Sequence, residues 1–174
     1  EDFVKEDWRN LNLDMKFDMI LGDCAITVVP YQDIESVIEK ISNHLNDKGL
    51  AVQRIWIRFK DQEYSLKGVV KRFEKRPSLI HWYTWMLFPV LLHYYDEKDE
   101  KLSGQELYEK MSKDFGEGKV PEKLLRRFSL VKNHKTLNNV LLKKDLEAVL
   151  EKHFEILKRE SGKDNFKRNA PIYI

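Results

Sequence analysis

Cysteine is nearly absent from this chain of 174 residues, because Cys24 is the only one. A single thiol excludes an internal disulfide and any cysteine-rich metal site. It also fits a reducing compartment, so we expect a cytoplasmic protein. The five histidines are scattered, without a His-x-x-x-His pair or a paired acidic ligand. We therefore expect no metal centre.

Long hydrophobic runs and an excess of one charge are also missing. The longest apolar stretch, residues 79–95, is short for a membrane span and carries His81, Pro89 and His93. With no secretory signal pattern either, we expect no membrane partner. The 31 basic and 29 acidic residues give a net charge of +2. This balance argues against a nucleic-acid partner, which would need a basic surface.

Glycine is sparse, with seven residues, and two of them punctuate a strand–helix–strand pattern. An apolar run over residues 17–22 predicts a strand, and a helical repeat follows from Asp33 to Asn46. Gly49 then predicts a left-handed helix stop before a second apolar run over residues 50–57. Two strands joined by a helix predict a parallel crossover, and hence an α/β sheet.

Ligands of such sheets bind beyond the carboxyl ends of the strands, where this chain carries Gly22-Asp23-Cys24. Gly22 would let a ligand approach the backbone closely. Asp23 could orient a substrate or take its proton, or it could cap the following turn. Cys24 has no basic neighbour in sequence to activate it, which favours a small core residue over a nucleophile.

Three motifs in order carry a family resemblance. They are Asp7-Trp8, the run Phe17-Asp-Met-Ile-Leu-Gly-Asp23, and the run Leu45-Asn-Asp-Lys-Gly-Leu-Ala-Val-Gln-Arg54. The set resembles the second half of a class I S-adenosylmethionine-dependent methyltransferase, similar to uncharacterised bacterial members. The resemblance implies an incomplete Rossmann-like sheet made of the fourth to seventh strands, within a single domain over residues 1–174. A helical insertion over residues 59–142, between the fifth and sixth strands, would serve as a substrate lid or an interface.

The remaining chain fits that arrangement. Ser103-Gly-Gln-Glu106 predicts a capping box at the start of a helix. Residues 143–153 predict an amphipathic helix, 154–157 a strand and 170–174 a short closing strand. In the resembling family the last strand inserts antiparallel into the sheet.

The resemblance also implies site residues. Asp7 would accept a hydrogen bond from the exocyclic amine of the cofactor's adenine, and Trp8 would form a wall against the ring. Gly22 and Asp23 would lie against the cofactor near the transferred methyl group. Asp23 is the predicted catalytic residue.

Four further residues are predicted to contact substrate. Tyr31 would line a wall, and Arg54, with Arg58, could bind a carboxylate or phosphate. A structural ion pair with a neighbouring helix is the alternative for the arginines. His81 and Trp85 lie on one face of an aromatic helix, as a lid or as plain core.

Two family features are missing from the sequence. No Gly-x-Gly precedes Asp7, and no acidic residue for the cofactor ribose is found. We therefore expect a fragment, the C-terminal portion of the enzyme. Its open sheet edge would be covered by a homodimer, a swapped element or a separate N-terminal segment. The predicted function is methyl transfer from S-adenosylmethionine to a small or medium acceptor. The alternative is a non-catalytic methyltransferase-like binding or assembly module.

Overall fold

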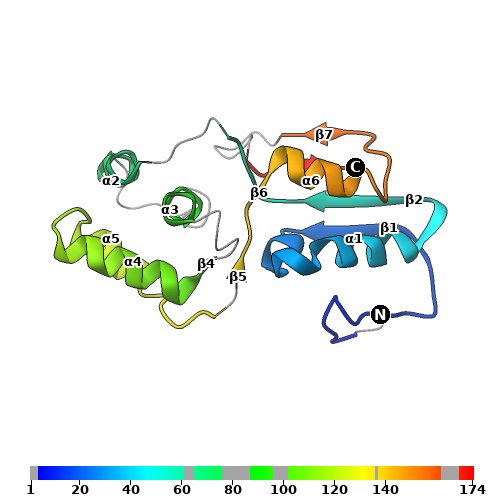
Figure 1. The fold of residues 1–174 in the computed structure, drawn as a ribbon, viewed down its shortest axis with the longest axis horizontal. Helices are drawn as coiled ribbons and strands as arrows, with labels where there is room; N and C mark the ends of the chain where they lie inside the picture. Colours follow the sequence, from blue (N-terminus) through cyan, green and yellow to red (C-terminus); the bar gives the residue numbers. More distant parts are fainter. Residues whose placement is uncertain (1–3, 61–64, 76–86, 96–101, 136, 162–168) are drawn as a thin grey trace.

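The computed structural model describes residues 4–60, 65–75, 87–95, 102–135, 137–161 and 169–174. Its main sheet has the strand order β1-β2-β8-β7. Figure 1 shows this sheet, with helices α1 and α6, beside a group of helices α2–α5. The chain is an α/β protein with a mixed sheet, as the strand–helix–strand pattern predicts.

The centre of the sheet is the parallel pair β1 (Phe17–Asp23) and β2 (Leu45–Arg54). The register places Gly22 beside Gln53 and Asp23 beside Arg54. Helix α1 (Ile34–Asn43) connects the two strands, so the predicted parallel crossover is confirmed. Among the described residues, β1 pairs with β2 alone and therefore forms one edge of the sheet.

The segment around Gly49 differs from the prediction. The helix ends at Asn43, and residues 46–49 form an irregularity inside β2, between the pairs Phe17–Leu45 and Met19–Leu50. Gly49 has no left-handed backbone there. A Cβ at Gly49 would lie 2.9 Å from the carbonyl oxygen of Phe17, so close approach of two strands, and not a helix cap, explains this glycine.

Helix α1 is amphipathic and buries four residues against the sheet, Ile34, Val37, Ile38 and Ile41. Helix α6 (Lys143–Leu150) packs into the same cluster through Leu146 and Leu150. Both helices cover one face of the sheet. Burial of this face is the main stabilising contribution to this half of the molecule.

The C-terminal strands are shorter than predicted. Residues 154–157 are not a strand, and the pairing residues are instead β7 (Arg159–Glu160) and β8 (Ile172–Tyr173). Strand β8 lies between β2 and β7 and is antiparallel to both. The predicted antiparallel insertion of the last strand is therefore observed, although the helix–strand boundaries are shifted.

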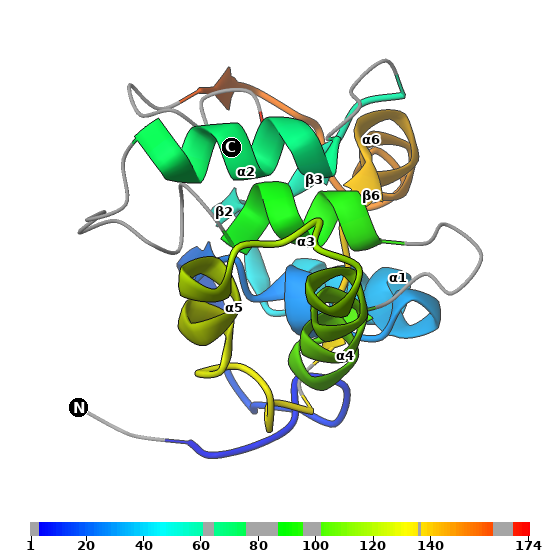
Figure 2. The same cartoon turned by 90° about the vertical axis from the view of Figure 1, so that its left-hand side faces the viewer.

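The helical part comprises α2 (Leu66–Lys75), α3 (Phe88–Tyr94), α4 (Gly104–Gly116) and α5 (Glu122–Phe128), shown from its own side in Figure 2. Two short pairings connect its ends: β3 (Ile57–Arg58) with β6 (Leu141–Leu142), and β4 (Leu102–Ser103) with β5 (Leu137–Asn138). The part has a hydrophobic core of its own, built around Phe88, Leu107, Met111 and Phe128. The predicted capping box is present at Ser103 and Glu106. No helix in the described ranges is long and apolar enough to cross a membrane.

Candidate functional site at the carboxyl end of the sheet

Asp23 and Arg54 form a bidentate ion pair where β1 and β2 end. Arg54 Nε donates to Asp23 Oδ1 at 2.6 Å, and Nη2 donates to Oδ2 at 2.5 Å. The guanidinium lowers the pKa of Asp23, and the carboxylate raises the pKa of Arg54. The predicted ion pair of Arg54 thus exists, but its partner lies on the neighbouring strand and not on a helix. Both side chains remain accessible to solvent.

Cys24 turns the chain directly after the strand end. Its φ of 57° lies in the left-handed region, and its N–H donates to the carbonyl oxygen of Arg54 at 2.8 Å. Burial, and then the neighbouring Asp23 carboxylate, raise the pKa of the Cys24 thiol to about 11. The thiol is therefore protonated at neutral pH, which favours the predicted structural role over a nucleophilic one.

The loop after Cys24 is held by a residue that sequence reasoning missed. The Asn139 N–H donates to the carbonyl oxygen of Thr27 at 2.7 Å, and its side-chain amide donates to the carbonyl oxygen of Val29. Asn139 is fully buried. An asparagine next to a short apolar run (Val140 to Leu142) is the only sequence signal that could have indicated this contact.

Gly22 lies beneath the side chain of Gln53. A Cβ at Gly22 would lie 1.8 Å from Gln53 Oε1, so the glycine leaves room for this amide. Gln53 is only 4% exposed, and its amide atoms have no hydrogen-bond partner among the described residues. The predicted reason for Gly22 was close approach of a ligand, but the group that approaches it is a side chain of this protein.

Asp7 is connected through Arg9 to the start of α1. Arg9 pairs with Asp7 at 2.7 Å and with Asp33 at 3.2 Å. The hydrogen bonds from Arg9 lower the pKa of Asp7 to about 2. Asp33 precedes α1 as predicted, but its side chain does not cap the helix. Because α1 starts at the carboxyl end of β1, Arg9 anchors Asp7 at the same end of the sheet as Asp23.

The indole of Trp8 contributes to an apolar pocket of about 260 Å³ along the open side of β1. Leu11, Leu21 and Val37 line the pocket with it. Trp8 is 36% exposed, so part of its ring is available to a ligand. Among the described residues, Asp7, Gly22 and Asp23 do not line this pocket. The pocket of Trp8 reaches Phe17 at the start of β1 and His44 after the end of α1, so the structure does not join Trp8 with Asp7, Gly22 and Asp23 in one cavity.

Tyr31 and Arg58, two further predicted substrate residues, have different surroundings. Tyr31 is exposed in a 3-10 turn (Tyr31–Asp33) ahead of α1. Arg58 Nε donates to the carbonyl oxygen of Val140, and its guanidinium lies 5.6 Å from the centre of the Tyr95 ring. His81 and Trp85 lie outside the described residues, so their predicted lid role stays a prediction.

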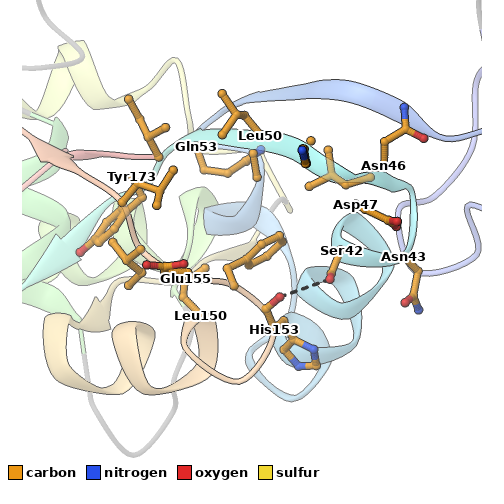
Figure 3. A pocket seen from close by; sticks show the side chains of 18 of the residues that line it. Ser42, Asn43, Asn46, Asp47, Leu50, Gln53, Leu150, His153, Glu155 and Tyr173 are labelled. Atoms are coloured by element: carbon orange, nitrogen blue, oxygen red, sulfur yellow. Dashed lines mark hydrogen bonds between the residues drawn. The ribbon is translucent and has the colours of Figure 1, made fainter.

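A larger cavity lies elsewhere. Its volume is about 530 Å³, and it lies between the first part of β2, the end of α1 and the segment after α6. Figure 3 shows Ser42, whose hydroxyl donates to the carbonyl oxygen of His153, at one wall, with Asp47, Glu155 and Tyr173 around the space. The cavity begins at the start of β2 and extends along the sheet to Gln53 and Tyr173, the pair next to Arg54 and Ile172. None of the predicted site residues that the structure describes lines it. In the described part of the chain, no three His, Cys, Asp or Glu side chains gather as a metal site would require.

Solved structures, but no protein families, resemble this chain. No protein-family model matches the sequence, and no curated protein is significantly similar to it. A Clostridium acetobutylicum S-adenosylmethionine-dependent methyltransferase has a similar structure, with a TM-score of 0.50, 16% identity, and coverage of 98% of this chain and 62% of that one. A Rhodobacter sphaeroides protein provisionally described as a Zn-dependent alcohol dehydrogenase gives a TM-score of 0.51, 14% identity, and coverage of 97% and 63%.

At these identities the likeness shows a Rossmann-like fold and nothing about activity. The chain spans less than two thirds of either protein. The resemblance to a methyltransferase is therefore structural and distant, and the activity is a matter for proposal.

Proposed function

We propose that this chain is the C-terminal portion of an S-adenosylmethionine-dependent methyltransferase, acting on a small or medium acceptor. The observation that carries the proposal is the strand order β1-β2-β8-β7 with β8 antiparallel. It corresponds to the order expected for the fourth, fifth, seventh and sixth strands of that fold. The helices α2–α5 would then be the insertion between the fifth and sixth strands.

In this proposal Trp8 holds the adenine end of the cofactor. Its half-exposed indole offers a stacking face inside an apolar pocket. The Asp7 carboxylate is ionised at neutral pH and can accept a hydrogen bond from an amine while still bound to Arg9. The chemistry of both side chains suits an adenine, although Asp7 lies outside the pocket that Trp8 lines. The bound cofactor supplies an electrophilic methyl group, and the chain's own contribution is to position the acceptor.

We place Asp23 next to the methyl acceptor in this proposal. Its carboxylate stays ionised because Arg54 lowers its pKa. In this state it can orient the acceptor or accept its proton, but only once it exchanges its partner. The left-handed Cys24, whose N–H donates to the carbonyl oxygen of Arg54, turns the chain directly after Asp23.

The open edge of β1 requires cover in the working enzyme. Met19 and Leu21 on this strand are 52% and 68% exposed. An edge strand with apolar residues and no interior lysine or proline is prone to pair with another strand. We propose that a second copy of the chain or a separate N-terminal segment covers it.

A non-catalytic binding or assembly module is the second candidate. Two observations favour it: Arg54 already neutralises Asp23, and the Gln53 amide occupies the space over Gly22. In that case the helical part from Phe59 to Val131 would be the partner surface. Such a module would not bind S-adenosylhomocysteine, the product that the cofactor leaves whichever acceptor is methylated.

Calorimetric titration with S-adenosylhomocysteine tests the proposal. We expect saturable binding that weakens about tenfold in Trp8→Ala, because stacking of a base on an aromatic ring is lost. Asp7→Asn should weaken binding too. Met15→Ala and Asp14→Asn, exposed positions in the same segment, are matched controls and should bind like the wild type. Equal binding in Trp8→Ala would overturn the proposed cofactor site. Absence of binding in the millimolar range would show that this chain does not hold the cofactor without the missing glycine-rich half, and would leave the family resemblance intact.

A further inference from the structure

On the face of the sheet opposite helices α1 and α6, the Arg54 guanidinium lies at the strand end beside apolar side chains. Side chains alternate along a strand, so Leu21 and Asp23 of β1 lie on the face of Val52 and Arg54 of β2. Ile172 of β8 is paired with Arg54 and lies on the same face. Leu21 is largely exposed, while Val52 and Ile172 are half-buried. Helices α1 and α6 cover the opposite face.

The Asp23 carboxylate shows which group Arg54 can bind. Two nitrogens of the guanidinium contact the two carboxylate oxygens side by side, at 2.6 and 2.5 Å. This is the fork geometry by which arginine binds planar carboxylates. The pair is exposed, and exposed ion pairs are weak, so a carboxylate from solution can compete with Asp23.

We propose that Arg54 recognises a carboxylate on the methyl acceptor, which displaces Asp23. The apolar body of the acceptor then lies on Leu21, Val52 and Ile172. The displaced Asp23 carboxylate becomes free to act on the acceptor's reactive group. The acceptor is therefore an aromatic or aliphatic carboxylic acid; this identification rests on the proposed function, whereas the anion site itself does not.

Nuclear magnetic resonance titration with benzoate tests the site. We expect saturable shifts of the Arg54 Nε–H and of the Leu21 and Val52 methyl groups. Benzamide, the neutral analogue, should give none. In Asp23→Asn, the loss of the internal competitor should tighten benzoate binding about fivefold. Asp18→Asn is the matched control, because Asp18 is on the other face and binds Asn46, and it should leave benzoate binding unchanged.

Arg54→Gln should abolish benzoate binding, and Arg54→Lys, which keeps the charge without the fork, should weaken it several-fold. Equal binding of benzoate by wild type and Arg54→Gln would overturn the inference, as would tighter binding of inorganic phosphate than of benzoate. Wild-type titrations with benzoate and with S-adenosylhomocysteine separate the two proposals. Binding of S-adenosylhomocysteine without binding of benzoate would overturn only the acceptor site. Binding of benzoate without binding of S-adenosylhomocysteine would count only against cofactor binding by this chain.

Discussion

Replacing Gly22 with alanine should destabilise the fold because of one specific side chain. The added methyl group would lie 1.8 Å from Oε1, 2.6 Å from Cδ and 2.9 Å from Nε2 of Gln53. Gly22 does not have a left-handed backbone, so alanine can adopt its conformation. The cost therefore comes from the clash with Gln53.

The size of the effect follows from how freely Gln53 can move. A side-chain amide is flexible, but this one is 4% exposed and packed within the sheet. Overpacking of a buried site costs about 1–3 kcal/mol, and we expect Gly22→Ala to fall in this range. Gln53→Ala removes both the clash and a buried amide without partners. In that background Gly22→Ala should be close to neutral, giving a coupling energy of about 1–2 kcal/mol.

Urea unfolding of the four variants of this cycle, followed by circular dichroism, measures the coupling. Gly116→Ala is the control, because a methyl group there meets nothing within 4 Å at the end of a helix. It should be neutral or stabilising by up to about 1 kcal/mol. Additive effects of Gly22→Ala and Gln53→Ala would refute the reasoning, and so would a Gly22→Ala protein as stable as the wild type.

Three further predictions follow from single features. Ser103→Ala should cost about 1 kcal/mol in urea unfolding through loss of the α4 cap, whereas Ser112→Ala in the same helix should be neutral; equal effects would contradict the cap. With its pKa raised to about 11, Cys24 should be roughly a thousandth ionised at pH 8. Its alkylation by iodoacetamide, followed by mass spectrometry, should accelerate about tenfold per pH unit toward that value, and a fast reaction at pH 8 would refute the burial argument. If a second copy covers β1, Leu21→Lys should turn a wild-type dimer into a monomer in sedimentation velocity; a monomeric wild type would exclude that cover.

Features set by neighbours in sequence could be predicted. The apolar run of β1, the amphipathic repeat of α1 and the capping box at Ser103 are all local patterns, and all three are present. The parallel pairing of β1 and β2 also followed, because a short helical crossover leaves little alternative. The sequence therefore correctly placed Asp23 at the carboxyl end of a strand.

Features that depend on contacts between distant residues could not be predicted from the sequence. The role of Gly49 depends on how closely Phe17 approaches it, and two-residue strands such as β7 exist only through their partner. The partner of Arg54 depends on the register between β1 and β2, which sequence spacing does not reveal. Arg9 was missed because its two acidic partners are separated by the whole of β1.

The indole of Trp8, followed by nuclear magnetic resonance during titration with S-adenosylhomocysteine, reports directly on the proposed cofactor site. Trp8 lines the open pocket, whereas Trp56 packs against the helical core and serves as the internal reference. We expect a saturable shift of the Trp8 indole N–H resonance, assigned through Trp8→Phe, with no shift for Trp56. An unchanged Trp8 resonance at saturating ligand would contradict it.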